Sequence, residues 1–130
     1  MMNYNEMTDF EINKLVAEKL DEAFLLPYIV TFNDSNEVVY LCEKDGISSI
    51  YPIAHFDPCN NPSDAWPIIL ENNIKLYIDD EYDDVGNLVK SCNAYTGTQA
   101  SSNTEYGKFN VDHKNPLRAA MIVYLMMGDE

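Results

Sequence analysis

The sequence predicts an α+β fold in which three main helices pack on an antiparallel sheet. Apolar residues recur at helical spacing in three segments, which predicts the helices. Runs of β-branched and aromatic residues, separated by turn residues, fill the stretches between them and predict strands. The chain shows no long strand–helix alternation, so a Rossmann fold is not expected. We expect residues 1–130 to form a single domain.

The first predicted helix begins at Thr8 and ends before Pro27. Thr8 and Glu11 have the spacing of a capping box, in which each side chain pairs with the backbone amide of the other residue. The apolar residues behind this start fall on one face of the helix. They are Ile12, Leu15, Val16, Leu20, Ala23 and Phe24. We therefore expect this helix to pack one face on a sheet and to expose the other.

The strands are predicted in two groups. Segments 28–32, 38–42 and 48–53 form a meander of antiparallel strands, because turn residues separate them. Segments 74–78 and 88–95 are further strands, joined by an acidic hairpin or loop. The small polar run at 96–104 predicts a surface loop, and 105–111 predicts a last edge strand.

The second and third helices each begin at an Asn-Pro pair, Asn61-Pro62 and Asn115-Pro116. Asparagine caps a helix well, and proline suits the first helical position, where its missing amide is not needed. The second helix is expected over 62–72, kinked or started again at Pro67, because an interior proline loses a hydrogen bond.

The third helix is expected to run from Pro116 to about Met127. It is apolar on nearly all sides, which is typical of a helix buried in a core or in an interface between copies of a chain. A homo-oligomer formed through this helix is one of our expectations.

Charge and hydropathy limit the function classes. The net charge of −14, from 22 acids against 8 bases, argues against direct nucleic-acid binding, because phosphates would meet a repulsive surface. It suits solubility at high expression, a basic partner protein or mimicry of a nucleic acid, and charge alone does not separate these. No apolar run reaches the roughly 18 residues that a membrane span needs. Because the acidic amino terminus is no secretory signal, we expect a cytoplasmic protein.

Neither a metal site nor an enzyme is expected. Cys42, Cys59 and Cys92 are an odd number without a C-x-x-C pair, which predicts buried, reduced thiols. Together with His55 and His113 they show no paired zinc-ligand spacing. The sequence lacks a G-x-S-x-G elbow, a Walker loop and an H-E-x-x-H motif, so we expect no catalytic residue and no cofactor.

The starts of the second and third helices form a candidate ligand site. Helix amino termini present amides and a partial positive charge that suit an anion, here at Asn61 and Asn115. Arg118 lies in the first turn of the last helix, where a cation opposes the helix dipole. We consider two roles for Arg118. It either binds a small anionic ligand, with Trp66 stacking on a base of that ligand, or it forms an ion pair with an acid such as Asp64. Trp66 is alternatively an anchor in the core or an interface.

Five acids fall within the six residues from 79 to 84. The D-x-D-x-D-G pattern of a calcium loop is absent. The simple interpretation is a solvated acidic loop, and the functional one is a docking surface for a basic partner. The acids of this candidate docking surface are Asp79, Asp80, Glu81, Asp83 and Asp84.

Two long strings carry a resemblance to a known family: CNNPSDAWPIILENNI at 59–74 and NPLRAAMIVYLMM at 115–127, with DFEINKLVAE at 9–18 in addition. On these residues the chain resembles the NinX-type phage proteins, a family without an assigned activity, and its layout is similar to the phage α-β-α sandwich domain. The resemblance implies helices on both sides of an antiparallel sheet. It also implies the cytoplasm of an infected bacterium as the compartment.

From these observations we expect a non-enzymatic phage accessory protein that counteracts a host function, such as a defence. It would either sequester a small anionic ligand such as a signalling nucleotide or block a host protein through its acidic surface. The alternatives are an accessory subunit in phage DNA metabolism or recombination, and an acidic nucleic-acid mimic.

Overall fold

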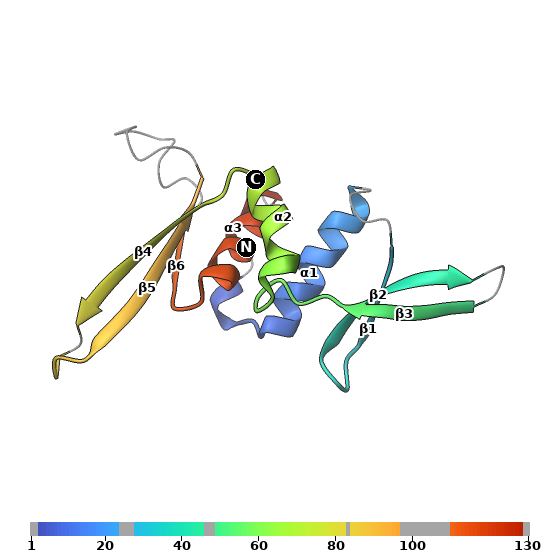
Figure 1. Cartoon of the computed structure of the whole chain (residues 1–130), viewed down its shortest axis with the longest axis horizontal. Helices are drawn as coiled ribbons and strands as arrows, with labels where there is room; N and C mark the ends of the chain where they lie inside the picture. The colour runs from blue at the N-terminus through green and yellow to red at the C-terminus, as the bar shows by residue number, and fades with distance from the viewer. Residues whose placement is uncertain (1–2, 24–27, 46–48, 83, 97–109, 129–130) are drawn as a thin grey trace. The chain divides into compact units, whose positions relative to one another are not determined.

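The computed structural model describes residues 3–23, 28–45, 49–82, 84–96 and 110–128 (Figure 1). The chain divides into two compact units, Met1–Asp57 and Pro58–Glu130. Each unit holds one antiparallel three-stranded sheet, in the orders β1-β2-β3 and β4-β5-β6. The predicted α+β class with three main helices is confirmed, and the strands form two sheets where we expected one. That residues 1–130 form a single domain stays a prediction.

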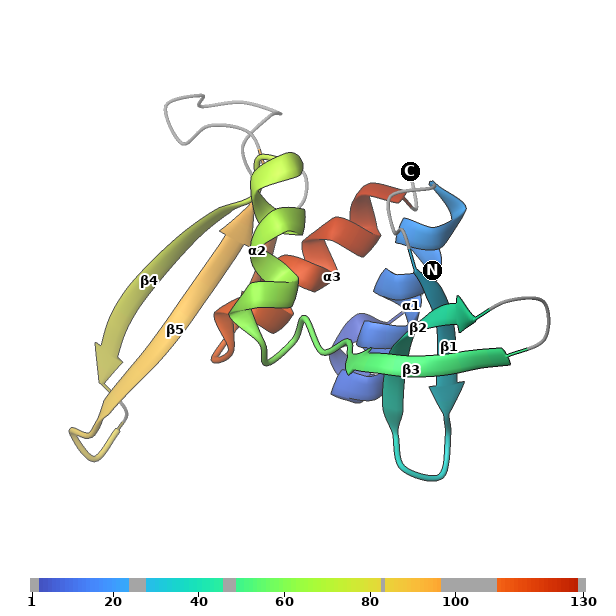
Figure 2. The same cartoon turned by 45° about the vertical axis from the view of Figure 1, so that its right-hand side comes forward.

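The first unit combines one long helix with its sheet (Figure 2). Its elements are the short 3-10 helix η1 (Tyr4–Glu6), α1 (Asp9–Glu22), β1 (Ile29–Asn33), β2 (Val38–Asp45) and β3 (Ser49–His55). The capping box at the start of α1 is confirmed. Thr8 Oγ1 accepts from the Glu11 amide at 3.1 Å, and Glu11 Oε1 accepts from the Thr8 amide at 3.0 Å. These two bonds satisfy amides that a helix start otherwise leaves unpaired.

Helix α1 packs on β1 and β2. Of its predicted inward face, Ile12, Val16 and Leu20 are buried, Leu15 is half-buried and Ala23 is exposed, whereas Phe24 lies outside the described residues. Ala17, which was not predicted, is buried as well. At the rim, Lys14 Nζ lies 4.8 Å from the ring centroid of Phe32, which is within the range of a cation–π contact. It also lies 3.9 Å from Asp34 Oδ1. The buried Asn13 donates from Nδ2 to Asp57 Oδ1 at 2.7 Å, and so joins the helix to the end of this unit.

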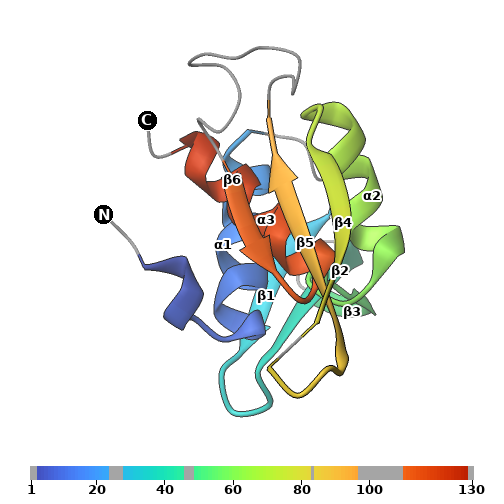
Figure 3. The same ribbon diagram turned by 90° about the vertical axis from the view of Figure 1, so that its left-hand side faces the viewer.

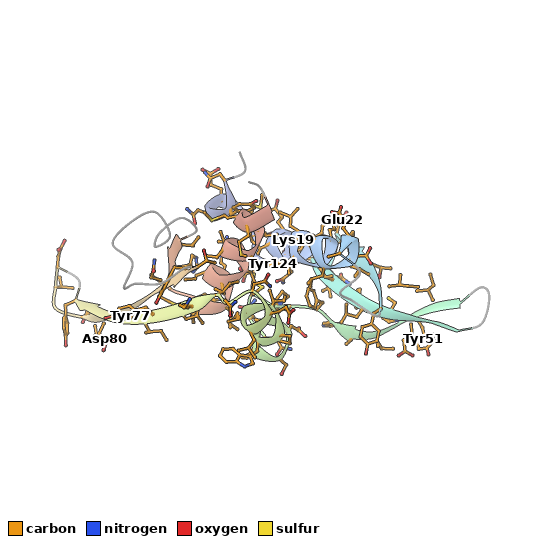
Figure 4. The ribbon with its side chains drawn as sticks, turned by 90° about the horizontal axis from the view of Figure 1, so that it is seen from above. Lys19, Glu22, Tyr51, Tyr77, Asp80 and Tyr124 are labelled. Carbon is orange, nitrogen blue, oxygen red and sulfur yellow. The ribbon has the colours of Figure 1, made fainter. Side chains whose placement is uncertain are left out.

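The β2–β3 hairpin contains a register shift between Leu41 and Cys42. Strand β3 is an edge strand that carries Pro52, and proline together with a bulge disfavours the addition of a further strand. On the exposed side of the hairpin, the Tyr51 hydroxyl donates to Glu43 Oε2 at 3.2 Å (Figure 4). This hydrogen bond, followed by the charge of Glu43 and by burial, raises the pKa of Tyr51.

The second unit stacks two helices over its sheet. Its elements are α2 (Pro62–Glu71), β4 (Lys75–Tyr82), β5 (Leu88–Tyr95), β6 (Asn110–His113) and α3 (Pro116–Gly128). Helix α3 packs on all three strands, and α2 packs on α3. Both helices therefore lie on the same side of this sheet, where a sandwich would place one on each side (Figure 3).

The last helix is buried along most of its length, from residue 118 to residue 125. This confirms the prediction of a buried apolar helix. One side of α3 contacts the sheet, and another contacts α2. A homo-oligomer formed through α3 stays a prediction.

Helix α2 is continuous through Pro67, so it does not start again there. It ends in a Schellman motif, in which the Ile74 amide donates to the Ile69 carbonyl at 3.0 Å and the Asn73 amide to the Leu70 carbonyl at 3.3 Å. Asn73 has a φ of 54°, the left-handed conformation that such a motif requires. The motif turns the chain from α2 directly into β4.

Two of the predicted segments, the last strand and the polar loop before it, are described by the structure only in part. The described last strand is Asn110–His113, whereas residues 105–109 of the predicted strand and the polar run beyond Thr96 lie outside the described residues. The three cysteines are buried and form no disulfide, as predicted. Within the described part of the chain, no helix is long and apolar enough to cross a membrane.

Burial gives Tyr124 a measurable effect at alkaline pH. Tyr124 lies buried in α3 (Figure 4), and desolvation raises the pKa of its hydroxyl above the ordinary value of 10.0. In the unfolded chain the hydroxyl ionises first, so its contribution is complete below pH 10 and is lost as the pH rises further. We expect urea unfolding of Tyr124→Phe to lose less stability between about pH 9 and pH 11 than the wild type. Tyr82→Phe, which removes an exposed hydroxyl, is the matched control, and equal slopes for all three proteins would contradict this assignment.

Candidate functional site

The two Asn-Pro helix starts contact one another. The Asn115 side chain donates from Nδ2 to the Cys59 carbonyl at 2.7 Å and lies 3.4 Å from Asn60 Oδ1. Cys59 and Asn60 directly precede Asn61, the cap of α2. The structure therefore brings together the two candidate ligand residues Asn61 and Asn115, although 54 positions separate them in the sequence.

Each first-turn amide of α2 has a partner within the helix start. Asn61 Oδ1 accepts from the Ser63 amide at 3.0 Å. The Asn61 carbonyl accepts from the amides of Asp64 and Ala65, both at 3.1 Å. Pro62 has no amide to satisfy.

The first-turn amides of α3 also have hydrogen-bond partners. Asn115 Oδ1 accepts from the amides of Leu117 at 3.0 Å and Arg118 at 3.3 Å. The Asn115 carbonyl accepts from the Ala119 amide at 3.0 Å. Because an anion binds a helix start through unpaired amides, and these are engaged, the geometry favours Asn61 and Asn115 as structural caps. A ligand role for them stays a prediction.

His113 links the sheet to the last helix. Its Nδ1 accepts from the Asn115 amide at 2.9 Å, which requires that this nitrogen carries no proton. The structure uses His113 as an acceptor at the end of β6.

Arg118 and Trp66 lie in different environments. Arg118 is buried and has polar contacts within the chain. Trp66 is 51% exposed on α2, so the core alternative for this residue is wrong. Leu70, one turn further along the helix, is exposed as well. An exposed indole suits an interface anchor better than a pocket shared with a buried guanidinium.

The acidic docking surface lies on a β-hairpin. Strand β4 continues to Tyr82, so Asp79, Asp80 and Glu81 belong to the strand. They stand opposite Ser91, Lys90 and Val89 of β5. Asp84 is exposed in the turn, and Asp83 lies outside the described residues. The hairpin alternative is thereby confirmed for this segment.

Glycine has a specific role in this turn. Gly86 has a φ of 89°, a backbone conformation that side chains disfavour, and an added Cβ would meet nothing within 4 Å. The glycine is therefore required by the backbone conformation and not by lack of space. It lets the chain reverse between β4 and β5.

Large apolar side chains surround these acids, and sequence reasoning missed them. They are exposed on both strands and in the turn, at Tyr77, Ile78, Tyr82, Val85 and Leu88. Clusters of exposed apolar residues are rare on monomeric surfaces and mark interaction sites. The available signal was that apolar residues flank and interrupt the acidic run, as Tyr82 does.

The comparisons with known proteins agree with the resemblance. The family model described as "Bacteriophage P22, NinX" matches residues 3–128. None of the curated proteins and none of the solved structures matches the chain.

The two caps differ in their expected contribution to stability. Asn61→Ala removes a single cap bond and should cost about 1 kcal/mol of unfolding free energy. Asn115→Ala removes the cap and the bond to Cys59, and should cost about 2–3 kcal/mol. Asn115→Asp keeps the accepting oxygen and loses the donor, so it should fall between them. Urea unfolding monitored by circular dichroism measures all three, and equal costs at the two caps would contradict the linking role of Asn115.

Trp66 reports directly on the ligand alternative, because it is the only tryptophan. Since the nearby helix amides are engaged, we expect nucleotides at about 1 mM, where even weak binding is populated, to leave its emission unchanged. Tryptophan fluorescence during titration with nucleoside mono-, di- and triphosphates and cyclic dinucleotides measures this. Saturable quenching by any of them would support ligand sequestration instead.

Proposed function

This chain belongs to the NinX family of bacteriophage P22, and we propose that it is a non-enzymatic accessory protein that binds a basic host protein. The binding surface is the β4–β5 hairpin, and binding would counteract a host function during infection. One observation carries the proposal: the hairpin exposes large apolar side chains among five acids.

The two kinds of side chain would contribute differently to binding. Burial of an exposed tyrosine, leucine or isoleucine contributes about 1.5–3 kcal/mol per side chain. An exposed ion pair contributes only about 0–1 kcal/mol. Tyr82, Ile78 and Leu88 would therefore supply most of the affinity. The acids would speed association and exclude acidic proteins.

The engaged helix starts support protein docking over sequestration of a small anion. The first-turn amides of α2 and α3 already have partners. The hairpin, by contrast, presents side chains that no helix of its unit covers. A subunit of phage DNA metabolism and a nucleic-acid mimic would use the same acidic surface, so the identity of the captured protein distinguishes these alternatives.

Neutralising the exposed acids of the hairpin tests the proposal. We expect Asp80→Asn with Asp84→Asn to reduce recovery of a basic partner from host lysate by about tenfold, which corresponds to about 1.4 kcal/mol. Tagged protein, affinity capture and quantitative mass spectrometry at two salt concentrations measure this. The loss should be larger at low salt, because screening weakens exposed charges.

Glu18→Gln with Asp21→Asn is the matched control, since it removes two exposed acids from α1. It should leave recovery unchanged. Equal recovery by the hairpin variant and the wild type would refute the proposed function.

A further inference from the structure

The hairpin has two faces, and they differ in what covers them. Resting on the function proposed above, we propose that the partner presents a basic amphipathic helix, which packs on the face of the hairpin that α3 leaves bare. We name this bare area the tip face; it comprises Ile78, Asp80, Tyr82 and Leu88. It lies on the same side of the sheet as α3.

The register of the strands assigns these residues to one face. Cys92, Ala94 and Val111 are buried, and they lie on the two strands on which α3 packs most. Ile78 stands opposite Cys92, and Tyr82 stands opposite Leu88. Since side chains alternate along a strand, Ile78, Tyr82 and Leu88 share the face of Cys92.

On this face, the exposure of side chains rises sharply from one strand position to its neighbour. Cys92 is 1% exposed, whereas its cross-strand neighbour Ile78 is 59% exposed. Further along, Tyr82 is 72% and Leu88 52% exposed. The sheet is therefore longer than the helix that covers it, and its bare part continues the surface on which α3 packs. Figure 4 marks this part of β4 by Asp80.

A helix fits this area better than a strand. The five residues from Ile78 to Tyr82 span about 13 Å, which is about two and a half helical turns. The face already accepts a helix, α3, beside the bare area. The free edge of β4 carries Lys75, Asp79 and Glu81 at strand positions, and charges along an edge disfavour strand addition.

The charge of the hairpin determines the chemistry of that helix. Residues 75–95 contain five acids against two lysines. Asp80 is exposed and lies on the tip face between Ile78 and Tyr82, with Lys90 of β5 at the position opposite it, and Asp84 is exposed in the turn. An apolar stripe at i, i+4 and i+7 would cover the apolar side chains, and flanking lysines or arginines would meet the acids.

A designed peptide tests the inference independently of the host partner. The probe is an 18-residue fluorescein-labelled peptide with leucines at i, i+4 and i+7 among lysines and arginines. A scrambled peptide of the same composition is its control. We expect the amphipathic peptide to bind the full-length chain at least tenfold more tightly than the scrambled one, measured by fluorescence anisotropy. Circular dichroism should show that it becomes helical on binding.

Variants on the two faces locate the contact. Ile78→Ser and Leu88→Ser should each weaken peptide binding at least tenfold. Tyr77→Ser, at an exposed position of the opposite face (Figure 4), is the matched control and should change binding less than twofold. Because all three side chains are exposed, the variants should remain folded, and their thermal unfolding checks this.

Three other outcomes would overturn this inference and leave the proposed function intact. Equal binding of the scrambled peptide would mean that charge alone is recognised. Equal weakening by Tyr77→Ser would place the contact on the opposite face, and no binding of the amphipathic peptide would exclude a helix. The proposed function falls separately, if neutralising Asp80 and Asp84 leaves capture of the host partner unchanged.

Discussion

The architecture of the second unit depends on the hydrogen bonds of one residue, Asn115. Its oxygen caps α3, and its nitrogen binds the Cys59 carbonyl just before α2. Its backbone amide donates to His113 at the end of β6. One residue thus fixes where both helices begin relative to the sheet. Because α3 begins directly after Asn115, this residue also determines which part of the sheet α3 covers. The tip face is the part of that side of the sheet that α3 does not cover.

Local features of the fold could be predicted from the sequence because their hydrogen bonds join residues close together in the chain. Thr8 and Glu11, or Asn61 and Ser63, need only their own spacing to pair. The division into two sheets could not be predicted in this way. Alternating residues identify a strand without identifying its neighbour, so the pattern does not show that β3 and β4, which follow one another in the sequence, belong to different sheets.

The charge of the candidate site could be predicted from the sequence, but the exposure of its apolar side chains could not. The acids at 79–84 are visible in any reading of the sequence. Ile78, Tyr82 and Leu88 have the same apolar character as residues of a core, and only the limited length of α3 leaves them exposed. Trp66 is the opposite case, since a lone tryptophan suggested a core or interface anchor and proved half exposed. Exposure depends on what packs above a residue, which is a tertiary property.

The acidic charge also explains how the chain can carry such an apolar area. An exposed apolar surface on a protein invites association with other copies. Two copies meeting at the tip face would bring two acidic hairpins together, each with five acids against two lysines, and like charges brought into one contact cost several kcal/mol. A partner with lysines or arginines at the same positions meets no such cost. The acids therefore select which apolar partner is allowed to bind, and the apolar side chains determine how tightly it does so.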